Sequence, residues 1–288
     1  MRILLIRHGE SVDNVAGSRD SPLTNHGVLQ IKRLGDHLVK RQDVIGPITH
    51  IFTSNLQRAY HTAMAIADAP FPAGGGGSEA RREVPVQVCQ LPELREKDYG
   101  SLEGKKYSVR GGHSTTSSLS QSDSETHDAM KTRIDRFLDS TLVPVLDRQV
   151  SDHVAVAVVA HGVILGVVLK VLLERFPTGE SPSGFQSNSR ESAAELVGMW
   201  SNTGVLQAKI ELDEPASSAG SQSKAQSRSD PKRVFRLTIE LANNLEHLGG
   251  LKKTRGGIGS AKFDSRQRTM DSFFGNAPKK RKLDEAQG

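Results

Sequence analysis

The chain has 288 residues, 36% apolar and 25% charged, which is enough apolar material for the core of one or two domains. Its single cysteine, Cys89, excludes a disulfide framework and any zinc site built from several cysteines. The net charge of +5 comes from residues 251–288, which hold a surplus of six positive charges. Residues 1–250 are therefore close to neutral, and a basic nucleic-acid-binding face on the folded part is not expected.

Two apolar segments resemble targeting or membrane segments only superficially. Residues 3–6 are too short for a signal-peptide core and are followed by Arg7 and His8. Residues 154–173 contain His161 and Lys170, which a lipid bilayer would penalise, so a buried strand followed by a helix explains them better. We therefore expect a soluble intracellular protein that makes no membrane contact.

Strands and helices alternate along residues 1–250. Short apolar runs predict buried strands at 3–6, 48–53, 84–88 and 153–160, and alternating patterns predict later ones at 205–212 and 234–241. Apolar stripes predict helices over 28–38, 56–66, 130–138 and 164–176. Thr24 is predicted to cap the first helix, and Ser122 with Glu125 has capping-box spacing before the third. The order predicts an α/β fold with three layers, α-β-α, around a mainly parallel sheet.

Polar, low-complexity segments interrupt and follow this pattern. The stretches 71–83, 108–124 and 213–232 are rich in Gly, Ser, Thr or Gln and are predicted to be flexible insertions, because nothing in them repays the entropy of ordering. Residues 251–288 are again polar and basic, which predicts a disordered tail. The sequence thus indicates one domain over 1–250 and a tail.

The polar residues that follow the predicted strands form an unusual set. The first strand ends in Arg7-His8-Gly9-Glu10, the second leads through Ser54 to Arg58, and the fourth ends in His161-Gly162. Because ligands of such sheets bind at the carboxyl ends of the strands, two histidines and two arginines should meet at one edge.

This set suits a phosphoryl group. Arginine forks match phosphate oxygens, and the helix after Ser54 would offer backbone N–H groups at its N-terminus. A neutral imidazole can attack phosphorus, while Gly9 and Gly162 would allow close approach of the phosphate. The remaining histidines show no metal-ligand spacing and are interpreted as structural or surface residues.

Four blocks of the sequence resemble the histidine phosphatase superfamily, in its phosphoglycerate-mutase-like branch. They occur in the family's order over about residues 1–250, and they are Arg7-His8-Gly9-Glu10-Ser11 with Asn14, Leu23-Thr24 and Gly27; Ser54-Asn55-Leu56-Gln57-Arg58-Ala59; Leu94-Arg95-Glu96 through Tyr99-Gly100-Ser101-Leu102-Glu103-Gly104; and His161-Gly162. The resemblance implies an enzyme, a phosphoric monoester hydrolase.

By this resemblance His8 is the nucleophile that becomes phosphohistidine, and Glu96 is the proton donor to the leaving oxygen. Arg7, Arg58 and His161 would stabilise charge on the transferring phosphoryl group, and Asn14 would lie near the phosphate. Asn202 is a candidate for supporting His161. No metal and no cofactor are implied, because the arginines supply the neutralising charge.

The branch contains both mutases and phosphatases. Mutases hold a second phosphate with an arginine pair after the Glu-containing loop, whereas residues 113–124 contain none, and the loop from Asn14 to Leu23 is shorter than in mutases. We therefore favour hydrolysis of a phosphorylated small molecule or phosphoprotein. The alternatives are a phosphoglycerate-type mutase and a non-catalytic nuclear adaptor that acts through its tail.

Two motifs lie in the tail. The basic run 278–282 (Lys279, Lys280, Arg281 and Lys282 after a proline) is similar to a nuclear localisation signal, which predicts an import receptor as partner and the nucleus, with the cytoplasm as a second location. Residues 267–274 resemble a PCNA-interacting-protein box, with Gln267, Met270, Phe273 and Phe274 as its binding residues. The alternatives are a solvated charge cluster and a segment that docks on the protein's own body.

Overall fold

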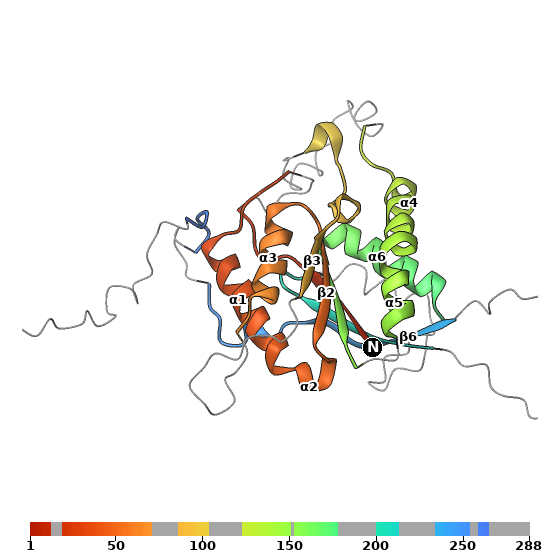
Figure 1. Ribbon diagram of the computed structural model, residues 1–288. Helices are drawn as coiled ribbons and strands as arrows, with labels where there is room; N and C mark the ends of the chain where they lie inside the picture. Colours follow the sequence, from red (N-terminus) through yellow and green to blue (C-terminus); the bar gives the residue numbers. More distant parts are fainter. Residues whose placement is uncertain are drawn as a thin grey trace, which may run out of the picture.

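The computed structural model describes residues 1–12, 19–70, 86–103, 123–150, 153–177, 200–212, 234–253 and 259–264 (Figure 1). Asn14, the insertions at 71–83 and 213–232, all but the last two residues of the one at 108–124, and both tail motifs lie outside the described residues.

Six strands form one sheet. They are β1 (Arg2–Arg7), β2 (Ile48–Thr53), β3 (Gln87–Gln90), β4 (Ala155–Ala160), β5 (Val205–Leu212) and β6 (Phe235–Asn244), in the order β3-β2-β4-β1-β5-β6. The pairs among β1 to β4 are parallel, whereas β5 is antiparallel to both of its neighbours. The predicted mainly parallel sheet is confirmed, and the predicted strands differ from the observed ones by only a few residues at their ends.

Helices cover both faces of this sheet. They are α1 (Asn25–Lys40), α2 (Gln42–Ile45), α3 (Gln57–Ala67), α4 (His127–Phe137), α5 (Val143–Gln149) and α6 (Gly162–Arg175), with the short helical segments η1 (Pro92–Leu94), η2 (Gly100–Leu102), η4 (Leu138–Leu142) and η5 (Glu246–Leu248). Figure 1 shows α1 and α3 on one side of the strands and α4, α5 and α6 on the other. The predicted three-layer α/β fold is confirmed.

The central strand β1 supplies both cores because its side chains alternate between the faces. Ile3 and Leu5 pack with α4, α5 and α6, whereas Leu4 and Ile6 pack with α1 and α3, and all four are fully buried. Burial on both faces explains why the strand has no polar residue between Arg2 and Arg7. The strand therefore holds its carboxyl end, where the candidate site begins, against two packed layers.

The helix starts agree with the sequence in one case and differ in another. Thr24 caps α1, since its Oγ1 accepts the N–H of Gly27 at 2.9 Å. The predicted capping box before α4 is wrong: the cap is Thr126, whose hydroxyl accepts the N–H of Ala129, and Glu125 instead pairs with Arg133. Among the residues described, no helix combines the length and hydrophobicity that crossing a bilayer requires.

Residues 259–263 lie along the start of α1. The N–H of Asn25 donates to Ala261 O at 3.0 Å, which satisfies one of the donors that every helix start leaves unpaired. Lys253 Nζ lies 2.9 Å from both carboxylate oxygens of Glu10. These contacts extend the packed body beyond residue 250, into the segment that the sequence assigns to the tail.

Candidate active site

The carboxyl ends of β1, β2 and β4 bring the predicted residues together. β4 pairs with both β1 and β2, so His8, Ser54 and His161 follow three adjacent strands. The rings of His8 and His161 lie with their centroids 5.0 Å apart at an interplanar angle of 59°. Both side chains are buried, and Arg58 from the first turn of α3 reaches the same place. The sequence prediction that these groups converge is correct.

The hydrogen bonds of His8 define which ring nitrogen bears the proton. Arg58 Nε donates to His8 Nε2 at 3.2 Å, so Nε2 holds a lone pair. The proton is therefore on Nδ1, which lies 2.6 Å from Gly9 O and donates to it. Burial, followed by the charges of Arg58 and Arg7, lowers the pKa of His8 well below its ordinary value. The ring is neutral at pH 7 and fixed in orientation by both nitrogens.

The two arginines lie beside these rings with part of their donors engaged. Arg7 Nη1 donates to Trp200 O, and Arg58 Nη1 donates to Arg19 O at 2.6 Å. Arg7 Nε is buried and has no hydrogen-bond partner among the described residues. Burial lowers the pKa of both guanidinium groups, and the nearby carboxylate of Glu96 opposes that shift. The site thus concentrates positive charge away from water, where it interacts strongly with an anion.

His161 is fully buried, yet neither of its ring nitrogens is hydrogen-bonded to any residue that the structure describes. Burial, then the neighbouring His8, Arg58 and Arg7, lowers its pKa well below the ordinary value, so the ring is neutral. Buried polar atoms in native proteins nearly always have a partner. An oxyanion bound between the two histidines would supply one.

Glu96 lies at the N-terminus of α6, directly after His161. Its carboxylate accepts the N–H groups of Val163 at 3.2 Å and Ile164 at 3.1 Å, which favours an anion at that end of the helix. Arg133 of α4 holds the Glu96 loop, since Nη1 donates to Glu93 O and, at 2.8 Å, to Arg95 O. Glu96 is therefore held from two sides.

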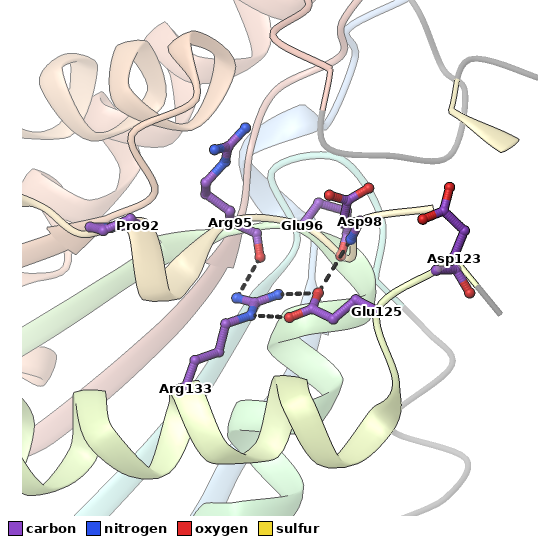
Figure 2. Close-up of a pocket in the computed structure, with 8 residues that line it drawn as sticks. Pro92, Arg95, Glu96, Asp98, Asp123, Glu125 and Arg133 are labelled. Carbon is purple, nitrogen blue, oxygen red and sulfur yellow. Dashed lines mark hydrogen bonds and ion pairs between the residues drawn. The ribbon is translucent and has the colours of Figure 1, made fainter. Parts of the chain in front are cut away.

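A cavity of about 410 Å³ opens beside Glu96 (Figure 2). It is lined by Pro92, Arg95, Glu96, Asp98, Asp123, Ser124, Glu125 and Arg133. Figure 2 shows Arg133 paired with Glu125 through two hydrogen bonds, at 2.7 and 2.9 Å, so this cation is already neutralised. The remaining charged groups of the lining are three carboxylates and Arg95.

A Cβ at Gly9 would lie 2.6 Å from Ile31 Cγ2, so this glycine allows packing against α1. Two other expectations are corrected by contacts at the site. At the start of α3, the Gln57 N–H donates to Asp20 Oδ1 at 2.7 Å and is not open to an anion. Asn202 contacts His8, not His161: its Nδ2 donates to His8 O at 3.1 Å.

Some residues that support the site were not predicted from the sequence. Thr62, one helical turn after Arg58, accepts the N–H of Gly9 at 3.1 Å, and the helical spacing from Arg58 could have indicated it. The contact of Trp200 with Arg7 had no sequence signal. Among the residues described, no group of three His, Cys, Asp or Glu side chains could hold a metal ion.

Comparisons with known proteins show which family the chain is similar to. Residues 3–188 match the model of the histidine phosphatase superfamily (branch 1). A probable phosphatase of Schizosaccharomyces pombe is 26% identical over 276 residues, covering 94% of this chain and 78% of the relative. A probable phosphoglycerate mutase GpmB of Yersinia enterocolitica is 29% identical over 197 residues, covering 62% of this chain and 78% of the relative.

A solved structure shows the same fold. It is a mycobacterial glucosyl-3-phosphoglycerate phosphatase with inorganic phosphate, with a TM-score of 0.55 and 20% identity over 84% of this chain and 97% of that one. The fold and the family match agree. The chain belongs to the histidine phosphatase superfamily, branch 1, and is a phosphoric monoester hydrolase.

Proposed function

We propose that the chain hydrolyses a phosphomonoester without a metal ion, through a phosphohistidine on His8. The observation that carries this proposal is the protonation pattern of His8: Nδ1 donates to Gly9 O, so the lone pair of Nε2 lies inside the site. In the first step Nε2 bonds to phosphorus as the bond to the leaving oxygen breaks. In the second step water attacks the phosphohistidine and inorganic phosphate leaves.

Arg7, Arg58 and His161 are proposed to stabilise the transferring phosphoryl group. Arg58 Nε–H donates to His8 Nε2 in this structure. When phosphorus bonds to Nε2, the same N–H would donate to a phosphate oxygen instead. Arg7 Nε and a ring N–H of His161, both buried without partners among the described residues, would donate to the others. Donors fixed in a dry site stabilise developing negative charge without reorganising.

Glu96 is proposed to protonate the leaving oxygen. It is close enough to Arg7 and Arg58 to oppose the effect of burial on both, and it also lines the cavity beside the site. A leaving alcohol that extends into that cavity would pass this carboxyl group. In this role the carboxyl group carries a proton when the substrate binds, and it transfers that proton to the leaving oxygen as the ester bond breaks.

The lining of the cavity favours hydrolysis over phosphoglycerate-type mutase activity, the second candidate. A mutase must retain a substrate that carries a second anion. Here Arg133 is occupied by Glu125 and two carbonyls, and the carboxylates of Asp98 and Asp123 oppose the attraction that Arg95, the other cation of the lining, would exert on a second phosphate. A product that is not held by a second anion would dissociate, and water would then hydrolyse the phosphohistidine.

For the tail, we propose that residues 267–274 bind the replication sliding clamp and that 278–282 direct nuclear import. Support comes from the sequence pattern alone, since both motifs lie outside the described residues. A tail peptide should bind the clamp, and changing Phe273 and Phe274 to Ala should abolish binding. Absence of binding by the wild-type peptide at high micromolar concentration would refute the recruitment proposal.

The catalytic proposal is tested by phosphate release in the presence of a chelator, on an aryl phosphate and on panels of phosphometabolites and phosphopeptides. We expect activity in the wild type and none in His8→Ala, with the acid-labile phosphoenzyme lost as well. Glu96→Gln should retain more activity on the aryl phosphate, whose leaving group needs no proton, than on alkyl phosphates.

His50→Ala is the matched control, because His50 lies within β2, is partly exposed and has no part in the proposed chemistry. Activity that survives in His8→Ala would refute the phosphohistidine mechanism. If the wild type releases no phosphate from any substrate, the adaptor alternative is favoured.

A further inference from the structure

The turn Trp200–Gly204, just before β5, holds the backbone of the candidate nucleophile. The N–H of Thr203 is shared between Arg7 O at 3.0 Å and His8 O at 3.2 Å. Asn202 Nδ2 donates to His8 O as well. The His8 carbonyl therefore has two donors, both from a segment almost two hundred residues away in the chain.

The same turn also binds Arg7 at two points. The N–H of Arg7 donates to Gly204 O at 3.2 Å, and its guanidinium donates to Trp200 O. One short turn thus fixes the backbone of both residues and the side chain of Arg7.

Thr203 adopts a conformation that a β-branched residue rarely takes. Its φ is 58°, in the left-handed region, and its side chain is fully buried. Such a conformation costs free energy and persists only where surrounding contacts enforce it, most often at functional sites. The conformation points the Thr203 N–H at the carbonyls of Arg7 and His8.

The contact that holds Thr203 comes from the C-terminal segment η5. The Thr203 hydroxyl donates to Asn202 O at 2.7 Å, so its oxygen must accept from His247 Nε2, which lies 2.9 Å away. Nε2 of His247 therefore bears a proton. Burial and the neighbouring His37 lower the pKa of His247 to about 4, so the ring is neutral at pH 7 and this is its single proton.

Asn243 fixes the other side of the turn. Its Oδ1 accepts the N–H of Ser201 at 3.0 Å and its Nδ2 donates to Ser201 Oγ at 3.1 Å. A Cβ on Gly204 would lie 2.1 Å from the same Oδ1, so the turn fits closely against this side chain. The turn is thus held by two residues from the end of β6 and from η5.

We propose that Asn202 and Thr203 are positioning residues that aim His8 and Arg7 at the phosphoryl group, and that His247 acts through Thr203. The inference rests on His8 being the nucleophile of the proposed function. His8 Nδ1 donates to Gly9 O. A shift of the His8–Gly9 peptide, whose carbonyl the turn holds, therefore also tilts the imidazole. Displacing a reacting group affects the chemical step more than substrate binding.

The test compares variants that remove one contact with variants that keep it. Thr203→Val keeps the shape but loses the hydroxyl, and His247→Leu loses the donor to it. We expect kcat to fall about tenfold in each while KM stays within twofold. Thr203→Ser and His247→Gln, which retain the hydroxyl and a donor, should stay within threefold of the wild-type kcat.

Two further variants separate positioning from stability. Asn202→Ala removes a single hydrogen bond from a partly exposed side chain, should remain folded, and should show the same loss of kcat. Val145→Ala, in α5 and away from the site, should lower the melting temperature with kcat unchanged.

The positioning role is overturned if Asn202→Ala, Thr203→Val and His247→Leu, all folded, keep the wild-type kcat. It is overturned equally if KM rises while kcat is unaffected, or if the conservative variants lose as much as the others. Failure of the nucleophile assignment gives a different result, because His8→Ala would then retain activity.

Discussion

Gly9 and Gly162 follow the two histidines in the same way along the chain, yet the structure gives them different roles. A Cβ at Gly9 would lie 2.6 Å from Ile31 Cγ2 and 3.0 Å from Gly27 O, whereas a Cβ at Gly162 would have its nearest neighbour, Arg7 Nε, at 3.8 Å. We predict that Gly9→Ala destabilises the protein and disables the site, and that Gly162→Ala does not reduce stability.

The magnitude follows from the missing space. The Gly9 contact is about 0.8 Å shorter than the 3.4 Å of ordinary van der Waals contact, and Ile31 cannot rotate away easily because β-branched side chains on helices favour one rotamer. Overpacking of this kind costs about 2 kcal/mol, which lowers Tm by roughly 4–8 °C in a domain of this size. Since Gly9 O holds the His8 ring, we expect kcat to fall about 100-fold.

The assay is chemical denaturation and phosphate release on both glycine variants beside the wild type. Gly162→Ala lies at the first residue of α6, so its stability should be equal or slightly higher. A Gly9→Ala protein with wild-type Tm and kcat would show that α1 yields without resistance, and would refute the packing argument. A large loss of stability in Gly162→Ala would refute it as well.

Three other predictions concern pH and the loop that bears Glu96. Because burial and the arginines lower the pKa of His8 well below 6.5, its lone pair remains available as the pH falls through 6.5, and kcat/KM should show no acid limb there; a limb at 6.5 that is caused by His8 would contradict this. The pKa of His247 is about 4 in the folded protein and near 6.5 in the unfolded chain, so protonation favours unfolding between these values. Between pH 7 and pH 5, His247→Gln should therefore lose less stability to denaturation than the wild type does. Equal losses would show that the pKa of His247 is not lowered in the folded protein. Arg133→Met leaves Glu125 and two carbonyls without their donor, which should cost about 2 kcal/mol and lower kcat about tenfold; unchanged kcat would show that Glu96 is held by α6 alone.

The groups that meet at the strand ends could be predicted from the sequence. His8 and His161 each directly follow an apolar run. Arg58 lies in the first turn of the helix that follows a third apolar run. In a parallel sheet, residues at these places share one edge whatever the details of packing. Local patterns and one topological rule were therefore sufficient for the candidate nucleophile and its cationic neighbours.

The residues that support this set could not be predicted. Asn202 was expected to support His161, but the antiparallel pairing of β5 with β1 places it at the His8 carbonyl, and the sequence does not reveal that register. The capping box before α4 failed because Glu125 is bound by Arg133, a tertiary contact. Gly9 and Gly162 look equivalent until the distance to α1 is known.

The place of β1 in the sheet has a consequence for how the enzyme is made. Of the strands described, β1 leaves the ribosome before the others, yet its neighbours β4 and β5 begin only at residues 155 and 205. A growing chain therefore holds His8 and Arg58 long before β4 and β5 can pair with β1, and that pairing must wait for a long loop to close. Such distant contacts slow folding, so the reactive centre is completed late in synthesis. A nascent chain that stops short of β5 carries the proposed nucleophile but has no assembled site.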